Sequence, residues 1–567
     1  MIRKIGQGVA GAALLIGIVT VVARVAGFGR YLVQSQTVGN LCLSTAYNTA
    51  NYVPNIVFEL VAGGALAGTV VPVLASAASR SATDPEARAE VGRTTSALLT
   101  WVLLALVPLT LLIAAFAGPV VTLLVGDVGD CDMSQVIGVG TDMLVVFAPR
   151  MIFFGLAVIL YGVLQAHRRF MGPALAPLVS SLLIIGSYLV FQPLGGDAAH
   201  DLSALTTVGQ LTLSLGATVA AAAMVVTVIG PVARLRLRLR PSLSFPPGVA
   251  ARARRLATAG VAVLVAQQIA LTVVVRLAND LGGAGATGVY TYAWALYQLP
   301  FAVLVVPIAT SSFPVLATRA GEGDLAGFDD LTASTTRVVL LVTGLAAGVM
   351  AAVAVPVARV FLQGTPGGDP AEMARAVVLF APGLAGYALM FHLARVLYAC
   401  GRGRSAAIAS VAGWVAALVA QILLAGATGE RTEVVGDLAL GSTVGMTVGG
   451  ILLVFAVLRA RGTAALHGAW RGLLAAVAGG GAAWAAGLAV VTPFQNVSKW
   501  MCVPVGLGAA SAGCVAFAIV ASVIDGPDAR MLLARFRRAP SKSSQDIQDS
   551  QGSRDPQESR ERNGADE

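Results

Sequence analysis

The chain has 567 residues, of which 56% are hydrophobic and only 12% are charged, and its mean hydropathy is +0.79. Water-soluble proteins of this size carry about 25% charged residues, so the composition excludes a soluble globular protein. Most of the formal net charge of +9 lies in short loops between apolar segments, which argues against nucleic acid as a partner.

Fourteen apolar segments follow one another along the chain. A helix needs about 20 apolar residues to cross the hydrocarbon core of a bilayer. Because backbone groups in lipid must be hydrogen-bonded within the protein, we expect an all-α integral membrane protein. The expected spans are 7–32, 44–76, 94–121, 139–166, 173–194, 204–232, 254–278, 286–317, 331–362, 374–400, 404–426, 435–459, 469–492 and 498–524.

The loops between these spans alternate in charge. Arginines gather in 77–93, 167–172 and 233–255 and around 402–404 and 459–461, whereas the intervening loops are neutral or acidic. Loops rich in Lys and Arg stay on the cytoplasmic side of a membrane. We therefore expect both termini to be cytoplasmic.

Short sequence matches about 240 residues apart indicate an internal repeat. VVPVLA at 70–75 is similar to SFPVLA at 312–317, and AVILYG at 157–162 is similar to ARVLYA at 394–399. The matches favour two six-helix lobes in parallel pseudo-repeat around a central cavity, plus two extra C-terminal helices. The expected divisions are an N-lobe (1–232), a basic cytoplasmic inter-lobe loop (233–253), a C-lobe (254–461), spans 13 and 14 (462–525) and a disordered cytoplasmic tail (526–567).

Several ionisable side chains fall inside the expected spans. Arg24, Glu59 and Arg150 lie deep in spans 1, 2 and 4, and Arg30 and Arg276 lie toward the outer ends of spans 1 and 7. Charges at such depths are costly and tend to face protein or a water-filled cavity. Two interpretations stay open, namely a buried ion pair of Glu59 with Arg24 or Arg150 that only fixes helix packing, and a polar substrate cavity.

Span 2 favours the cavity. Asn48, Asn51 and Asn55 recur at helical spacing and place a hydrogen-bonding stripe on one face. An excess of arginine selects an anion, and the planar guanidinium suits phosphate, so a diphosphate is the expected ligand of Arg24, Arg30, Arg276 and Arg150. Glu59 and Asp142 are the candidates for coupling a cation.

The remaining chemistry-bearing residues form no recognisable active site. Cys42 and Cys131 both fall in expected outer loops, where a disulfide can form. The histidines and the other cysteines show no metal-ligand spacing, and no catalytic constellation is present. We expect neither an enzyme nor a cofactor.

Several motifs resemble those of one known family. They are RVAGFGR at 24–30, AY at 46–47, VPN at 53–55, GAL at 64–66, VP at 71–72, FAP at 147–149, QAHRRF at 165–170, PALAP at 173–177, YA at 292–293, LP at 299–300 and Pro314. They are similar to the motifs of the MurJ/MviN family of lipid II flippases, which belongs to the MOP exporter superfamily. The similarity is strong in the first lobe and weaker after residue 320.

The resemblance implies a substrate and a location. The substrate would be lipid II, an undecaprenyl-diphosphate-linked peptidoglycan precursor, moved from the inner to the outer leaflet of the bacterial plasma membrane by alternating access. Spans 13 and 14 would hold the lipid tail, and Arg24 and Arg30 would contact the diphosphate. Membrane lipids and cell-wall synthesis proteins are the other implied partners, and the membrane potential or a monovalent cation is the implied driving force.

The chain departs from the family pattern at three positions. Thr45 stands where many members have Asp, Glu59 lies where a basic pair is common, and Ala295 replaces an arginine. Arg276 and Arg150 are expected to supply the missing charge. Other functions compatible with the sequence are a flippase for another polyprenyl-linked oligosaccharide, a cation-coupled multidrug exporter, and a non-transporting scaffold for wall synthesis.

Overall fold

The computed structural model describes residues 2–61, 70–245, 249–427, 429–494 and 497–524, and every regular element among them is helical. Twelve helices in these residues are long and apolar enough to cross a membrane, or thirteen if the bent pair α15–α16 counts as one span. The expected span 44–76 contains residues 62–69, which lie outside the described residues.

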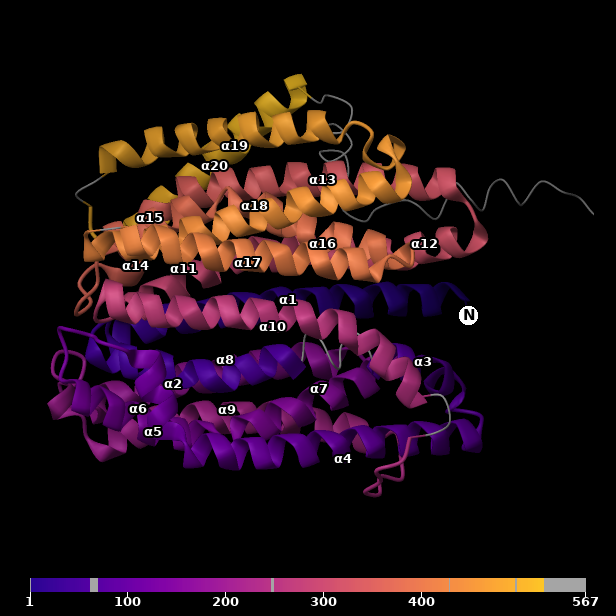
Figure 1. Ribbon diagram of the computed structural model, residues 1–567, viewed down its shortest axis with the longest axis horizontal. Helices are drawn as coiled ribbons and strands as arrows, with labels where there is room; N and C mark the ends of the chain where they lie inside the picture. The colour runs from indigo at the N-terminus through magenta and orange to yellow at the C-terminus, as the bar shows by residue number, and fades with distance from the viewer. Residues whose placement is uncertain (1, 62–69, 246–248, 428, 495–496, 525–567) are drawn as a thin grey trace, which may run out of the picture.

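The first half of the described chain forms the N-lobe, which is drawn in indigo to magenta below the C-lobe in Figure 1. Its helices run nearly parallel, as spans joined by short loops must. They are α1 (Ile2–Val38), α2 (Cys42–Glu59), α3 (Val70–Arg80), α4 (Pro85–Ala115), α5 (Ala117–Val125), α6 (Met133–Phe147), α7 (Arg150–Ala166), α8 (Met171–Leu194), the 3₁₀ turn η2 (Leu202–Ala204) and α9 (Thr207–Ala233).

The second half forms the C-lobe and two further helices. The C-lobe contains α10 (Val249–Gly282), α11 (Ala286–Pro300), the π turn η3 (Phe301–Val305), α12 (Val306–Glu322), α13 (Leu325–Ala352), α14 (Ala354–Leu362), α15 (Pro370–Phe380), α16 (Gly383–Ala399), α17 (Gly403–Ala427), η4 (Arg431–Glu433) and α18 (Val434–Arg461). The additional elements are η5 (Thr463–Leu466), α19 (Ala469–Val491), η6 (Thr492–Phe494) and α20 (Cys502–Ile524), and α19 and α20 pack on α13 through Leu341, Ala475 and Phe517.

Both lobes break their spans at equivalent places. The fourth span of each lobe is interrupted by the same tripeptide, Phe-Ala-Pro, at 147–149 between α6 and α7 and at 380–382 between α15 and α16. Proline lacks a backbone N–H and disrupts the helix before it, and the second pair bends by 45°. The second spans also carry prolines, with Pro54 inside α2 and Pro300 at the end of α11 directly before η3.

Carboxylates cap several helices outside the membrane. Asp84 accepts a hydrogen bond from Glu86 N at 2.8 Å at the start of α4, and Asp132 accepts from Ser134 N at 2.9 Å at the start of α6. These bonds satisfy backbone donors that a helix leaves free. The Ser134 hydroxyl and backbone amide lower the pKa of Asp132, because they stabilise its charged form.

Small residues bring α17 and α18 into close contact in the C-lobe. A Cβ on Gly413 would lie 2.7 Å from the Cα of Gly449, and a Cβ on Gly445 would overlap Ala417. Helices in lipid gain little from hydrophobicity and associate through such close packing. The glycines therefore act here as the contact surface of the pair.

Candidate functional site

Two of the predicted arginines lie together in the N-lobe. Arg150 is buried, donates a hydrogen bond to Asn51 Oδ1, and has its guanidinium 5.2 Å from the Phe147 ring centre and 5.3 Å from that of Phe154. Arg30 on α1 is close enough to Arg150 for the two positive charges to repel. Neither arginine forms an ion pair with an acidic side chain among the described residues, so their positive charges favour an anion nearby.

Tyrosines and amides surround this arginine pair. Arg30 Nη2 donates to Tyr31 Oη at 3.0 Å, and the hydroxyls of Tyr47 and Tyr188 are 2.9 Å apart. Tyr188 also donates to Gln34 Oε1 at 3.3 Å. We call this group the N-lobe polar cluster. Its members are Arg30, Tyr31, Gln34, Tyr47, Asn48, Asn51, Arg150 and Tyr188.

The asparagine stripe of α2 is divided between roles. Asn48 is buried, accepts from Gln34 Nε2 at 2.8 Å and donates to Ser44 Oγ at 3.0 Å. Asn51 holds Arg150. Asn55 is half-buried and makes no side-chain hydrogen bond with any described residue, so its amide is free for a ligand.

Arg24 and Glu59 occupy a second place, between the lobes. Both side chains are exposed, and the Glu59 carboxylate lies within electrostatic range of Arg24 on α1 and of Tyr387 on α16 in the C-lobe. Arg395 on the same helix also acts on Tyr387, and its guanidinium lies 3.4 Å from the Phe391 ring centre. The Glu59 carboxylate is therefore exposed in a region to which both lobes contribute nearby residues.

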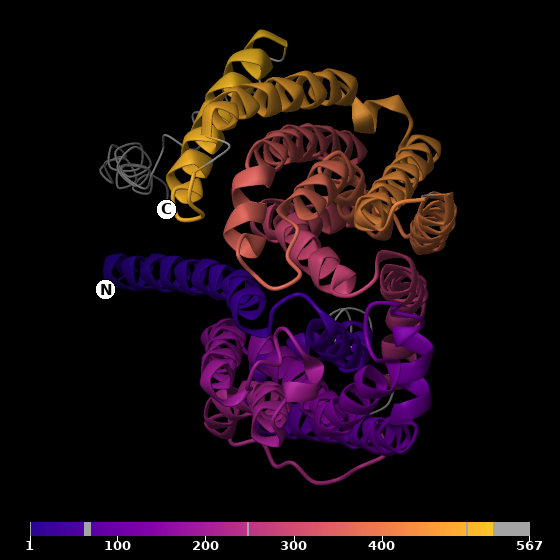
Figure 2. The same cartoon turned by 90° about the vertical axis from the view of Figure 1, so that its left-hand side faces the viewer.

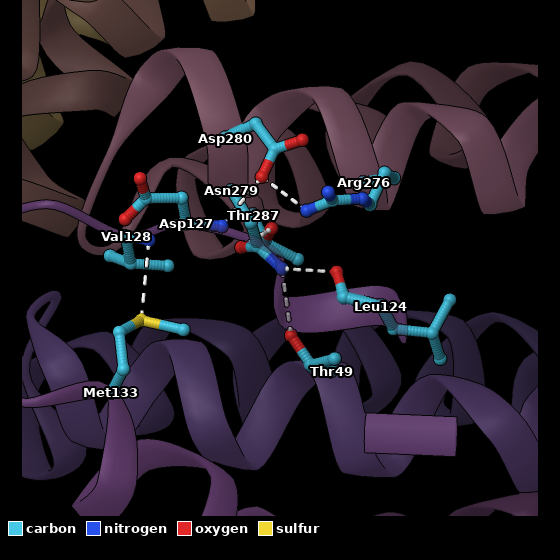
Figure 3. A network of polar contacts seen from close by, with 9 residues as sticks. All are labelled: Thr49, Leu124, Asp127, Val128, Met133, Arg276, Asn279, Asp280 and Thr287. Carbon is cyan, nitrogen blue, oxygen red and sulfur yellow. Dashed lines mark hydrogen bonds and ion pairs between the residues drawn. The ribbon is translucent and has the colours of Figure 1, made fainter. Parts of the chain in front are cut away.

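Arg276 lies apart from Arg24 and Glu59, at the outer contact between the lobes. It forms an ion pair with Asp280, whose carboxylate also accepts from Asp127 N at 2.7 Å in the N-lobe (Figure 3). The acid compensates the charge of Arg276 in this conformation. The structure therefore separates Arg24, Arg30 and Arg276 instead of gathering them in one site, and their roles with substrate stay predictions.

Asn279 is the centre of that outer contact. Its side chain is fully buried and points from α10 toward the N-lobe, donating to Thr49 Oγ1 at 3.1 Å and to the Leu124 carbonyl at 3.0 Å (Figure 3). It accepts from Thr287 Oγ1 at 2.6 Å. Asn279 thus joins α2 and α5 of one lobe to α10 and α11 of the other.

Further bonds close the outer ends of the lobes. Thr45, one of the departures from the family pattern, is buried and accepts from Gly285 N at 2.9 Å. Asn40 N donates to the Pro366 carbonyl at 2.9 Å, and Ser35 Oγ donates to that of Phe361 at 2.9 Å. The lobes are thus hydrogen-bonded at their outer ends, and any opening to that side must break these bonds.

A disulfide and an ion pair lie at the same end. Cys42 and Cys131 are joined with an S–S distance of 2.01 Å, which ties the start of α2 to the 126–132 loop. Asp130 of that loop pairs with Arg431 of the C-lobe at 2.7 Å. The disulfide thereby holds the loop that carries the N-lobe partner of this ion pair.

The last two predicted positions differ in environment. Asp142 is exposed on α6 and accepts a hydrogen bond from Gln210 on α9 at 3.2 Å, within the N-lobe. Ala295 is half-buried on α11. Of the two acids proposed for ion coupling, Glu59 alone neighbours residues of both lobes in the described structure.

Sequence reasoning missed the partners of the arginines. Tyr188, Gln34 and Asn279 carry no motif, and nothing in their local sequence distinguishes them from ordinary polar residues of a span. The tripeptide 380–382 did carry a signal, since it repeats 147–149 and precedes α16, the helix that supplies Tyr387 and Arg395.

Comparison with known sequences agrees with this arrangement. The model of a protein family described as lipid II flippase MurJ matches residues 35–503. The lipid II flippase MurJ of Burkholderia cenocepacia is 26% identical over 393 residues, which cover 68% of this chain and 73% of that protein. A probable lipid II flippase MurJ of Rhizobium tropici is 23% identical over 330 residues, or 58% of this chain and 59% of that protein.

Solved structures show the same fold. A lipid II flippase MurJ in an inward closed conformation superposes with a TM-score of 0.68 at 16% identity and covers 92% of this chain and 100% of its own. A multidrug resistance MATE family transporter of the MOP superfamily, in an inward-facing conformation, gives a TM-score of 0.60 at 12% identity and covers 78% of this chain and 98% of its own. With the family match extending over most of its length, this multi-pass membrane protein belongs to the lipid II flippase MurJ family.

Proposed function

We propose that this protein moves lipid II from the inner to the outer leaflet of the bacterial plasma membrane for peptidoglycan synthesis. The observation that carries the proposal is the family match over residues 35–503, which includes every helix from α2 to α19. Arginines without acidic partners in the N-lobe polar cluster support an anionic substrate. The protein acts as a transporter and not as a catalyst of a chemical reaction.

The proposed mechanism is alternating access. With the lobes joined at their outer ends, the head group enters the region around Arg24 and Glu59, and Arg24 takes the diphosphate. The arginines offset part of the cost of bringing a charged head group into a medium of low dielectric constant. The lobes then part at their outer ends, and the tail stays in lipid along α19 and α20.

The driving force and orientation are parts of the same proposal. Both termini lie on the cytoplasmic side. Export moves the anionic head group away from the negative side of the membrane, so an inside-negative potential assists it by about 2.3 kcal/mol per charge per 100 mV. Glu59 is the candidate for coupling a monovalent cation, because it lies beside Arg24. No cofactor is needed, and the partners are lipid II, membrane lipids and cell-wall synthesis proteins.

A multidrug exporter is the alternative with a similar fold. The MATE transporter covers 78% of the chain, whereas the MurJ structure covers 92%. A cavity for cationic drugs also needs acids, but Arg30 and Arg150 have no acidic partner within the described residues. Both observations favour the flippase.

Replacing Arg24 with Ala tests the proposal. The variant should reach the membrane in normal amounts and lose at least tenfold in lipid II export, because removing a charge-assisted bond to the substrate costs roughly 1.5–3 kcal/mol. Conditional depletion of the wild type, complemented by the variant and followed by a leaflet-specific assay of lipid II, measures this loss. Arg402→Ala, in an exposed loop, is the matched control.

Two results would contradict the proposal. Unchanged lipid II export by Arg24→Ala would show that Arg24 does not bind the substrate. Accumulation of a different polyprenyl-linked glycan in depleted cells, with lipid II at its normal level in both leaflets, would show that this glycan and not lipid II is the substrate.

A further inference from the structure

The loop that follows α9 displays a row of arginines. Residues 234–243, which we call the strap, leave the helix in a turn and continue without regular secondary structure, with a positive φ of 51° at Arg236. Exposed and half-buried side chains alternate from residue 234 to residue 238. Leu235 and Leu237 pack against apolar residues of the N-lobe. The alternate positions are all exposed arginines, namely Arg234, Arg236, Arg238 and Arg240.

The strap is fixed against one face of α4. Arg240 N donates to Ser96 Oγ at 3.0 Å, and Ser242 N donates to Thr100 Oγ1 at 3.1 Å. The Arg238 carbonyl lies against Gly92, where a Cβ would approach it to 3.1 Å. Positions 92, 96 and 100 lie one above another on a helix, so the strap follows α4 from its cytoplasmic end toward its apolar part.

The strap lies on the outside of the molecule. It runs along the edge of the N-lobe away from the C-lobe in both views (Figures 1 and 2). Its end carries the exposed apolar side chains Leu239 and Leu243, and the exposed Trp101 of α4 donates its indole N–H to the Leu243 carbonyl at 3.0 Å. Tryptophan in such a position is typical of the interface between head groups and hydrocarbon.

The charge on the strap is uncompensated. None of its four arginines forms an ion pair with a residue in the described part of the chain. Setting the orientation of the spans requires positive charge in the loop but no fixed conformation. A docked segment that presents its arginines on one face and its leucines on the other has the arrangement of a binding surface.

We propose that the strap binds the anionic head groups of phospholipids in the cytoplasmic leaflet. The arginines contact head-group phosphates, to which guanidinium groups can donate two hydrogen bonds at once. Leu239 and Leu243 contact the acyl chains beside α4. The surface is separate from the substrate path, so it gathers anionic phospholipid around the N-lobe whatever the protein transports.

Fluorescence of Trp101 tests the proposal directly. The full-length protein is reconstituted in phosphatidylcholine bilayers that contain a minor fraction of either brominated phosphatidylglycerol or brominated phosphatidylcholine, since bromine quenches tryptophan on contact. Subtracting the signal of Trp101→Phe from that of each protein isolates this residue among the six tryptophans. We expect stronger quenching by the brominated phosphatidylglycerol, and a rise in salt concentration should reduce the difference.

Substitution of two arginines gives the second arm. Both double variants are measured with and without Trp101. R236Q/R238Q should lower the preference for phosphatidylglycerol by about tenfold, and R236K/R238K should keep most of that preference. R402Q/R404Q removes the same charge from the exposed start of α17 and the residue before it, and should leave the Trp101 preference unchanged. Equal quenching of the wild type by both lipids, which is also the outcome if an acidic protein occupies the strap, would overturn the proposal. So would an unchanged preference in R236Q/R238Q.

Discussion

Asn279 shows how much one buried amide contributes to the conformation of the whole protein. Its three hydrogen bonds use both functions of the amide, and two of them reach the other lobe. These bonds exist only while the outer ends of the lobes are together. Their free energy therefore contributes to the equilibrium between conformations closed and open to the outside, in addition to stabilising the fold.

Replacing Asn279 with Ala should shift that equilibrium toward the open conformation. Buried partners left without a hydrogen bond cost roughly 1–3 kcal/mol, which changes the population ratio about 5- to 150-fold. Spin labels on Ser203 and Glu430, with Cys400, Cys502 and Cys514 replaced by Ala, would report longer distances between the outer ends. Thr49→Ser, which keeps the hydroxyl that Asn279 contacts, is the control, and an unchanged distance distribution in Asn279→Ala would contradict the assignment.

At the scale of elements, the pair α17–α18 depends on the absence of side chains. Four glycines of α18, at 441, 445, 449 and 450, face α16 or α17 at distances that leave no room for a Cβ without a shift. Glycine in a helix costs about 1 kcal/mol relative to alanine, so these residues are compensated by the close packing that they permit. The same reasoning explains why the outer surface of the pair carries large apolar residues such as Ile422 and Ile451 instead.

Gly445→Ala should therefore destabilise the protein. Its Cβ would overlap Ala417, and overpacking of a close contact costs about 1–3 kcal/mol. Thermal unfolding in detergent should show a lower transition temperature. Gly186→Ala on α8, where nothing lies within 4 Å of the added Cβ, is the matched control and should keep or raise the transition temperature. An equal effect in both variants would show that the contact does not limit stability.

At the scale of the whole molecule, the proposed mechanism requires the two lobes to separate at their outer ends. Gly39 and Pro366 face each other across this contact, and a Cβ on Gly39 would lie 3.6 Å from that of Pro366. Disulfides span Cβ atoms about 3.5–4.5 Å apart, so cysteines at these positions have the spacing of a bridge between the lobes. A cysteine at position 39 is held in the strained left-handed conformation that Gly39 adopts at a φ of +75°.

Oxidised G39C/P366C should stop lipid II export nearly completely, and a reductant should restore it. The measurement is the leaflet-specific lipid II assay, with cross-linking followed by mass spectrometry. Wild type treated with the same reductant controls for loss of the Cys42–Cys131 disulfide. Full export by the cross-linked protein would show that the lobes need not part at this contact.

Deletion of residues 530–567, which lie outside the described residues, separates a transporter from a scaffold. A flippase should retain most of its lipid II export without this segment, because both lobes and the last two spans stay intact. A protein that acts by recruiting wall-synthesis enzymes through its tail should lose its function. Complementation of a depleted strain by the shortened chain decides between these outcomes.

The sequence by itself determined the class of the protein, most of its spans and the residues that carry charge into the membrane. A membrane span is recognised from about 20 consecutive residues, and the charge of a loop from fewer, so both can be predicted from a short stretch of sequence. The motif residues likewise identified the family that the comparison then showed. Arg24, Arg30 and Arg150 were identifiable because a charge in lipid is costly wherever it lies.

Only the tertiary structure decided which of these residues meet. Arg276 resembled Arg30 in the sequence, yet it is paired with Asp280 one helical turn away, whereas Arg30 lies beside Arg150 on a distant segment. Thr45 and Asn279 acquire their roles from the approach of the other lobe. The reason is physical: a hydrogen bond acts over about 3 Å, and which groups come that close depends on how helices far apart in the chain pack together.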